Sequence, residues 1–159
     1  RTSSSAASDV YKRQIHSYGG NDINLISGKL NLLKIKQILK KHGHIMCQKF
    51  LNKIKFGDKR VFIINGKVCG AISRVPKSGS ILSNMSKGAK PKIAFLSNKE
   101  LKVSNIIAKK IKKDGIYFAG IDFIDGKLNG DINVTSPTGI KTYFDLSQIN
   151  LAKTFWKGL

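Results

Sequence analysis

The sequence predicts an α+β fold in which mostly antiparallel strands are covered by helices on one side. Two dipeptides, Asn65-Gly66 and Asp125-Gly126, each lie between apolar, β-branched runs. That pattern is typical of hairpins closed by two-residue type I′ turns. Apolar residues at helical spacing mark further segments. We therefore expect the order strand, helix, strand, hairpin, loop, helix, hairpin, helix.

The first half of the chain supplies five of these elements. A glycine turn over residues 18–22 precedes a short strand at 23–26. Residues 30–41 place apolar side chains at helical spacing, and Gly43 ends the expected helix. The remaining expected strands are 44–51, 60–64 and 67–74, the last two being joined by the first hairpin turn.

The second half begins with a long polar loop over residues 76–91, a length that is usually functional or disordered. Ser97 and Glu100 form a capping-box pattern that opens a helix ending at Gly115. The second hairpin pairs residues 116–124 with residues 127–134, and residues 146–156 predict a final helix.

Composition limits the possible classes of protein. The chain has 159 residues and 41% hydrophobic content, enough for one globular domain with a core. No apolar run approaches the roughly 20 residues of a membrane span, so no membrane partner is expected. Cys47 and Cys69 lack a CxxC partner, which indicates neither a disulfide framework nor a zinc site and favours the cytoplasm.

The formal net charge of +20 points first to polyanionic partners. Nearly all of the bases are Lys, however, and Arg occurs only at positions 1, 13, 60 and 74. Proteins that recognise specific nucleobases use Arg as well as Lys, and RNA-binding sites favour exposed aromatic residues. A basic nucleic-acid-binding module is therefore an alternative function, although we expect no nucleic-acid partner.

Residues 1–14 are small, polar and aperiodic, and the chain lacks an initiator Met. We expect residues 1–14 to be a foreign or unstructured leader and exclude them from fold reasoning. Residues 15–159 are then expected to be one partial domain, a fragment of a longer protein.

The second hairpin also predicts a metal site. With Asp125 and Gly126 as the loop, Gly120 lies opposite Asp131 and Phe118 opposite Asn133. Because side chains alternate along a strand, Asp122, Asp131 and Asn133 would share one face. Their hard oxygen donors suit Mg²⁺ held partly by substrate phosphates. The alternative is a solvated hairpin face without a metal.

Four short motifs, in this order and at this spacing, resemble the C-terminal ATP-grasp half of prokaryotic glutathione synthetase. They are residues 57–60 (Gly-Asp-Lys-Arg), 74–76 (Arg-Val-Pro), 120–122 (Gly-Ile-Asp) and 132–138 (Ile-Asn-Val-Thr-Ser-Pro-Thr). The resemblance covers about residues 15 to 158.

The resemblance implies a ligase that joins γ-glutamylcysteine to glycine with ATP as co-substrate. The reaction passes through an acyl phosphate, requires Mg²⁺ or Mn²⁺, and releases ADP and phosphate. The family also implies a cytoplasmic protein whose parent enzyme can form a homo-oligomer. Another ATP-grasp ligase with different substrates is the alternative within the enzymes.

The resemblance also assigns roles to residues. Arg60 and Arg74 are similar to the arginines near the γ-phosphate and the activated carboxylate, and residues 76–91 resemble the mobile loop that closes over the acyl phosphate. The metal ligands would again be Asp122, Asp131 and Asn133. The other implied contacts are Gly19 and Gly20 over the phosphates, Gln48, Lys49, Phe50 and Leu51 at adenine, Asp58 near the ribose, and Ser136, Pro137 and Thr138 at the peptide substrate.

The chain departs from the family pattern at several points. Asp131 stands where the family usually has Glu, in a hairpin that is one residue longer, and Leu82 stands where the mobile loop usually has Arg. A phosphate-binding Lys and the N-terminal substrate domain are missing, so we expect residues 1–159 alone to be inactive or nearly so. A regular hairpin would also place Arg60 and Arg74 on opposite faces, so we expect a β-bulge at Gly70.

Overall fold

The computed structural model describes residues 10–14, 24–26, 32–78, 80, 83, 85 and 88–158. The chain forms two compact units, Arg1–Asn52 and Lys53–Leu159. Within the described residues, no helix is both long and apolar enough to cross a membrane.

The first unit contains a three-stranded antiparallel sheet in the order β2-β1-β3, formed by β1 (Val10–Gln14), β2 (Asn24–Ile26) and β3 (Ile45–Lys49). Helix α1 (Leu32–His42) lies in the expected segment. Strand β1 corrects the expected exclusion of residues 1–14 from the fold, because Val10–Gln14 pair with both neighbouring strands. Val10 and Tyr11 favour a strand, whereas the small polar residues that suggested a leader precede them.

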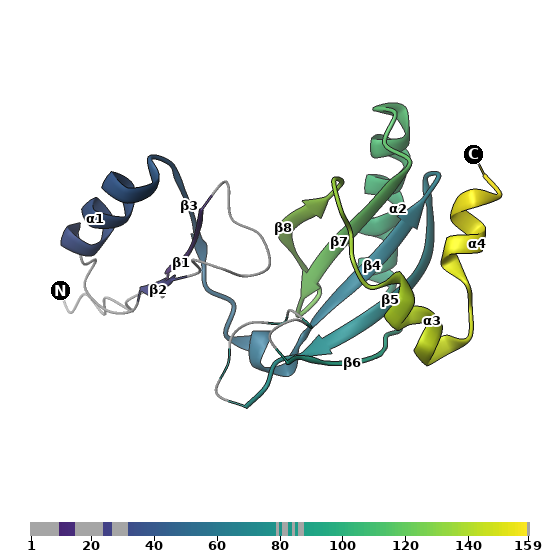
Figure 1. The fold of residues 1–159 in the computed structure, drawn as a ribbon, viewed down its shortest axis with the longest axis horizontal. Coiled ribbons are helices and arrows are strands. Elements are labelled where there is room, and N and C mark those ends of the chain that lie inside the picture. Colours follow the sequence, from purple (N-terminus) through teal and green to yellow (C-terminus); the bar gives the residue numbers. More distant parts are fainter. Residues whose placement is uncertain are drawn as a thin grey trace. The chain divides into compact units, whose positions relative to one another are not determined.

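The second unit contains a five-stranded antiparallel sheet in the order β6-β5-β4-β7-β8 (Figure 1). The 3₁₀ helix η1 (Asn52–Phe56) leads into it. Its strands are β4 (Asp58–Ile64), β5 (Lys67–Val75), β6 (Lys90–Ile93), β7 (Phe118–Ile124) and β8 (Lys127–Asn133). Strand β6 was not expected; it contains Pro91, which an edge strand tolerates because its outer side needs no ladder hydrogen bond.

Both predicted hairpin turns are confirmed by their backbone angles. Asn65 and Gly66 have φ values of 49° and 72°, and Asp125 and Gly126 have φ values of 51° and 69°. Positive φ at both central residues is the requirement of a type I′ turn, which Asn-Gly and Asp-Gly satisfy with little strain.

The bulge expected at Gly70 is present, with Cys69 as the extra residue. Phe62 pairs with Gly70 and Ile63 pairs with Val68, so Cys69 has no partner on β4. The shift restores the alternation of side chains, so that Arg60 and Arg74 lie on the same face.

The register expected for the second hairpin is wrong beyond its first pairs. Phe123 pairs with Leu128 as expected, but Gly120 lies opposite Asn133, not opposite Asp131, and Phe118 has no partner in β8. Residues 129–131 bulge opposite Asp122. Asn129 and Gly130 are poor strand residues, which explains why the bulge falls there.

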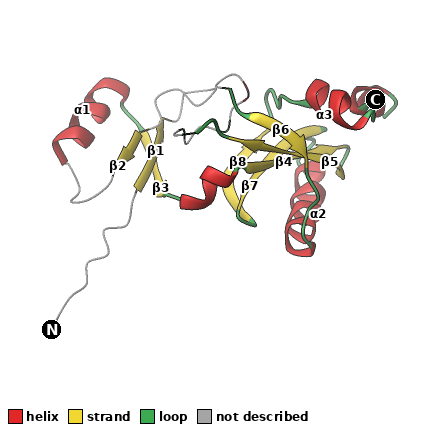
Figure 2. Cartoon of the chain, turned by 90° about the horizontal axis from the view of Figure 1, so that it is seen from below, coloured by secondary structure: helices red, strands yellow, loops and turns green. Residues whose placement is uncertain are grey.

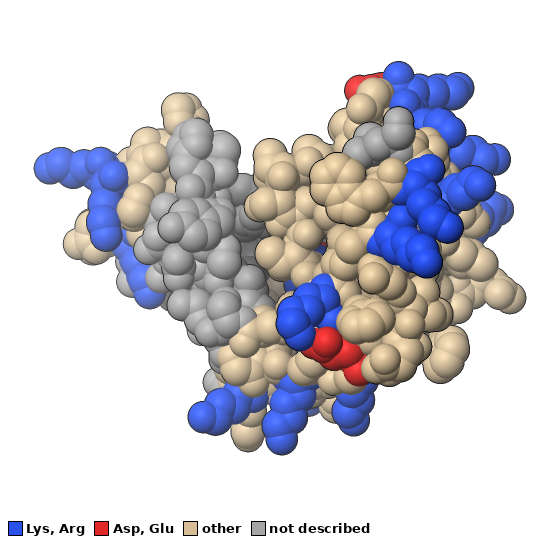
Figure 3. All heavy atoms as spheres, turned by 45° about the vertical axis from the view of Figure 1, so that its right-hand side comes forward, with Lys and Arg blue, Asp and Glu red and all other residues tan. Residues whose placement is uncertain are grey.

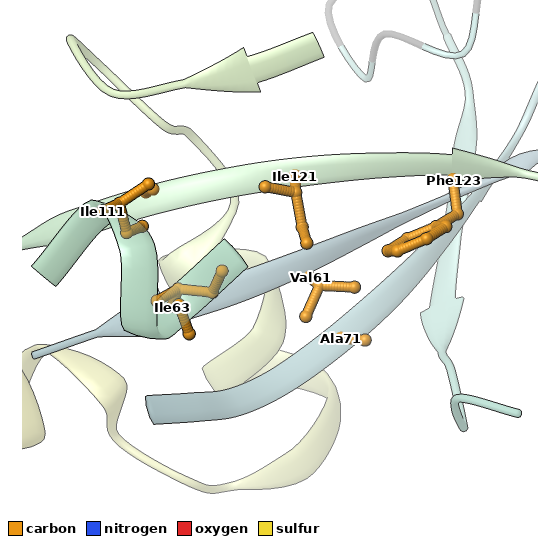
Figure 4. Close-up of a cluster of buried hydrophobic side chains, with 8 residues drawn as sticks. Val61, Ile63, Ala71, Ile111, Ile121 and Phe123 are labelled. Carbon is orange, nitrogen blue, oxygen red and sulfur yellow. The ribbon is translucent and has the colours of Figure 1, made fainter. Parts of the chain in front are cut away.

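Helices cover both faces of this sheet, not one as the sequence suggested (Figure 2). On one face, Val61, Ile63 and Ile121 pack with Ala108 and Ile111 of α2 (Asn98–Lys113), as Figure 4 shows for most of this cluster. Alternate residues of β4 point to the other face, where Phe62 and Ile64 pack with residues of α3 (Ile140–Ser147) and α4 (Leu151–Trp156).

The C-terminal segment forms two helices where one was expected. Gln148 has a φ of 61° and ends α3, and the Asn150 side chain accepts a hydrogen bond from the Lys153 N–H at the start of α4. By contrast, the capping box at α2 is confirmed: Ser97 accepts from the Glu100 N–H, and the Glu100 carboxylate accepts from the Ser97 N–H.

Candidate functional site

Four charged residues are buried together on the face of the sheet that carries α3 and α4. Asp58 and Arg60 lie on β4, Arg74 on β5 and Asp122 on β7, and each is only 4–6% exposed. Strand pairing sets their neighbours, because Arg60 lies opposite Asp122 and Asp58 lies opposite Arg74. We call these four residues the buried quartet.

The two arginines of the quartet bind the two carboxylates through the same edge of the guanidinium group. Arg60 donates from Nε and Nη2 to the two oxygens of Asp122, at 2.8 and 2.6 Å. Arg74 donates from Nε and Nη2 to the two oxygens of Asp58, at 2.8 and 2.5 Å. Arg74 Nη2 also lies 3.0 Å from Asp122 Oδ2, which links the pairs into one network.

Burial and pairing act in opposite directions on the acidic groups. Burial raises the pKa of Asp122, but the hydrogen bonds and charges of Arg60 and Arg74 lower it by more than burial raises it. The pKa of Asp122 therefore lies below its usual value. Burial raises the pKa of Asp58 above its usual value, Arg74 offsets this only in part, and the nearby negative charge of Asp122 adds to the rise. Burial lowers the pKa of Arg74, but Asp122 and Asp58 together raise it above its usual value, so this guanidinium stays charged.

Each guanidinium keeps its Nη1 group largely uncommitted. Arg74 Nη1 has no hydrogen-bond partner among the described residues, and Arg60 Nη1 makes only a 3.5 Å contact with the carbonyl oxygen of Thr138. An arginine carries five N–H donors, so pairing through Nε and Nη2 leaves donors for an anion such as a phosphoryl oxygen.

A turn after β8 lies beside Arg60. The Asn133 carboxamide oxygen accepts from the Ser136 N–H at 3.1 Å, and its Nδ2 donates to the Ser136 carbonyl at 3.3 Å. Gly120 permits this approach, because a Cβ atom there would lie 3.1 Å from Pro137 and 3.4 Å from Arg60 Nε. Ser136, Pro137 and Thr138 therefore lie at the same end of the sheet face as Arg60.

The structure brings some of the residues of the predicted metal site together. Asp122 and Asn133 belong to the same face, because Gly120 pairs with Asn133 and Asp122, two residues after Gly120 on β7, shares the face of Gly120. The backbone of Asp131 belongs to the bulge opposite Asp122, but its side chain lies outside the described residues. Among the described residues, no three His, Cys, Asp or Glu side chains form a metal cluster.

The donor set nevertheless fits Mg²⁺ in chemical type. Asp122 Oδ1 accepts a single hydrogen bond from the described residues, and each carboxylate oxygen has two lone pairs. A carboxylate and a carboxamide oxygen on one face, with a second acid on the adjacent bulge, are ligands that Mg²⁺ prefers.

Two more groups of predicted residues belong to the first unit or lie outside the described residues. Gly19, Gly20 and Leu82 lie outside the described part of the chain. Gln48 and Lys49 end strand β3 of the first unit, Lys49 is exposed, and Phe50 and Leu51 are half-buried. Their adenine role stays a prediction.

Sequence reasoning missed one feature of residues 76–91. Met85, from the middle of this segment, packs on the cluster of Phe62, Ile72 and Tyr143, and its sulfur accepts from Thr142 Oγ1 at 3.4 Å. Met85 therefore packs on the sheet face that bears the quartet. A lone Met among polar residues gives little signal of this in the sequence.

The high positive charge of the chain does not lie at this site. The charges of the quartet cancel, whereas Lys102, Lys109 and Lys112 are exposed on α2. Figure 3 shows Lys and Arg side chains gathered at its upper right. The neutral quartet thus lies on the sheet face opposite the one covered by α2 and its exposed lysines.

Comparison with known proteins gives matches over most of the chain. The family model described as "Prokaryotic glutathione synthetase, ATP-grasp domain" matches residues 3–148. The chain is 41% identical over 108 residues to glutathione synthetase of Prochlorococcus marinus strain MIT 9313, covering 68% of the chain and 35% of that protein. It is 32% identical over 151 residues to glutathione synthetase of Brucella melitensis, covering 93% of the chain and 48% of that protein.

Solved structures share the fold at low sequence identity. The crystal structure of a D-cycloserine synthetase superposes with a TM-score of 0.64 at 11% identity, over 83% of the chain and 49% of that protein. D-alanine–D-alanine ligase from Bacillus anthracis, solved with ATP, superposes with a TM-score of 0.56 at 13% identity, over 94% of the chain and 46% of that protein. The chain thus spans about a third to a half of the length of the relatives that it matches.

Proposed function

The chain belongs to the prokaryotic glutathione synthetase family, in its ATP-grasp domain, and we propose that it carries the phosphoryl-transfer centre of a ligase joining γ-glutamylcysteine to glycine. The observation that carries the proposal is the pair of buried arginines, Arg60 and Arg74, held on one sheet face. Among the described residues, Nη1 of Arg74 has no hydrogen-bond partner, and Nη1 of Arg60 makes only the 3.5 Å contact with the Thr138 carbonyl.

The proposed reaction has two steps. The carboxylate of γ-glutamylcysteine attacks the γ-phosphorus of ATP, the bond to the β–γ bridging oxygen breaks, and ADP leaves. The amine of glycine then attacks the acyl phosphate, the C–O bond to phosphate breaks, and the amine loses a proton as the amide forms. Both steps place negative charge on phosphoryl oxygens, so positioned cations are the main requirement.

Arg60 and Arg74 meet that requirement in our proposal. Their guanidinium groups are planar and permanently charged, and each donates from Nε and Nη2 to one carboxylate, Arg60 to Asp122 and Arg74 to Asp58. The Nη1 groups would donate to the phosphoryl oxygens. Because both side chains are buried, little solvent rearrangement would accompany the charge shift.

Asp122, Asp131 and Asn133 would hold Mg²⁺. When bound there, Mg²⁺ would supply positive charge to neutralise the phosphates of ATP. Asp122 would then act twice, as a ligand through its oxygen lone pairs and as the partner that orients Arg60.

The remaining roles follow from the family resemblance. Gly19 and Gly20 would contact the phosphates, residues 48–51 would hold adenine, and Ser136, Pro137 and Thr138 would contact the peptide substrate. The contact of the Thr138 carbonyl with Arg60 supports the last assignment, because it joins the turn to one of the two arginines of the proposed phosphoryl-transfer centre.

The test is turnover by the complete protein. We expect release of ADP from Mg·ATP that requires both γ-glutamylcysteine and glycine, and a loss of at least about a hundredfold in kcat for Arg60→Ala. ADP release that ignores these two substrates but responds to a different acid and amine would indicate another ATP-grasp ligase. Absence of ADP release, together with salt-sensitive duplex binding tighter than Mg·ATP binding, would support the nucleic-acid module instead.

A further inference from the structure

Asp58 has no direct task in the proposed chemistry, yet it is one of the most constrained polar residues of the chain. Both of its oxygens accept from Arg74, at 2.8 and 2.5 Å, and both side chains are almost fully buried. The family resemblance suggests a ribose contact for Asp58, but in this structure its carboxylate is directed at Arg74.

The backbone next to Asp58 also lies close to Arg74. Gly57 has a φ of 102°, and a Cβ atom at this position would lie 2.8 Å from the carbonyl oxygen of Arg74. Only glycine fits both the positive φ and this close approach. Gly57 thereby starts β4 directly against Arg74, and Asp58 becomes its cross-strand neighbour.

We propose that Asp58 is a positioning residue that fixes the guanidinium of Arg74 so that Nη1 points to the anion, a role that rests on the proposed function. An unrestrained arginine side chain has many rotamers, and ordering it on binding weakens affinity. Asp58 and Asp122 hold the Nε–Nη2 edge beforehand, which leaves a single donor group, Nη1, for the ligand.

Two other roles for Asp58 predict different results. If Asp58 only balances charge, its position does not matter, and removal of its charge should strengthen anion binding. If Asp58 contacts ribose, its replacement should weaken binding of ATP but not of inorganic pyrophosphate, which has no ribose.

The test uses Asp58→Glu, which keeps the charge and moves the carboxylate by one methylene. We measure binding of magnesium pyrophosphate and Mg·ATP to the complete protein by calorimetry. Positioning predicts that both ligands bind about five- to tenfold more weakly. The matched control is Glu100→Gln, since Glu100 is a buried carboxylate paired with Lys59 at 2.8 Å in the α2 capping box. We expect this control to bind both ligands as the wild type does.

A second measurement does not depend on binding. The chain has only four arginines, so their Nε–H signals in a ¹⁵N-labelled sample are few, and Arg74→Lys assigns one of them. The Arg74 Nε–H should be protected from hydrogen exchange with solvent in the wild type and should lose this protection in Asp58→Asn. Asn has about the size of Asp, so this variant adds no bulk, unlike Asp58→Glu.

The outcomes separate the two levels of inference. Wild-type affinity for pyrophosphate in Asp58→Glu would overturn the positioning role, as would an unchanged Arg74 signal in Asp58→Asn. Failure of the complete wild-type protein to bind either ligand would overturn the proposed function, and the Arg74 signal alone would then decide whether Asp58 orients Arg74.

Discussion

Replacement of Asp122 by Ala should be among the most destabilising single changes in the second unit. Asp122 accepts from Arg60 at 2.8 and 2.6 Å and lies 3.0 Å from Arg74, and it is 4% exposed. The change leaves Arg60 buried without a charged partner, while Arg74 keeps Asp58. Removing one partner of a buried ion pair costs about 3–5 kcal/mol, because the remaining charge is left desolvated. For a domain of this size, that loss is a large part of the free energy of unfolding.

The assay is urea unfolding followed by circular dichroism, with the free energy of unfolding extrapolated to water. The control is Asp145→Ala, which removes the exposed helical pair between Lys141 and Asp145 at 2.7 Å and should cost at most about 0.5 kcal/mol. The double variant Arg60→Met with Asp122→Leu should recover part of the loss, because it leaves no buried, unpaired charge at position 60. Equal losses below about 1 kcal/mol for Asp122→Ala and Asp145→Ala would refute the reasoning.

Two further predictions concern packing and pH. Gly70→Ala should cost about 1–3 kcal/mol in urea unfolding, because its Cβ would lie 2.5 Å from the buried Tyr143 ring; an unchanged midpoint would contradict this close contact. Lowered pKa values of Asp122 and Glu100 mean that their stabilisation is present above the usual pKa values of 3.8 and 4.5 and is lost as pH falls below them. The raised pKa of Asp58 acts in the opposite sense, so Asp58→Asn should make the fall of Tm between about pH 5 and about pH 2 steeper, and an unchanged slope would contradict the sign.

Local chemistry explains what the sequence could predict. The two type I′ turns depend on residues that tolerate positive φ, and the start of α2 depends on Ser97 and Glu100 three positions apart. Such signals are complete within a few residues. The bulge near Gly70 also followed from the sequence, but only because Arg60 and Arg74 had to meet on one face.

Features that depend on distant residues were harder to predict. The register of β8 changes at a bulge that Asn129 and Gly130 permit but do not require. Helix α3 is stabilised by Tyr143, which packs edge-on to Phe62 at 5.8 Å between ring centroids, a contact across 81 positions that no local pattern encodes. The partner of Asp58 was missed for the same reason, because Gly-Asp before a strand is compatible with an ordinary turn.

The most direct test of the central claim compares two variants in calorimetric binding of Mg·ATP to the complete protein. Arg74→Lys keeps the positive charge but lacks the planar group that Asp58 and Asp122 hold, whereas Lys109→Ala removes an exposed charge from α2 and leaves the quartet intact. We predict that Arg74→Lys weakens binding at least about tenfold and that Lys109→Ala changes it less than about twofold. Wild-type affinity in Arg74→Lys, with weakened binding in Lys109→Ala, would contradict a defined phosphoryl site and indicate binding by surface charge.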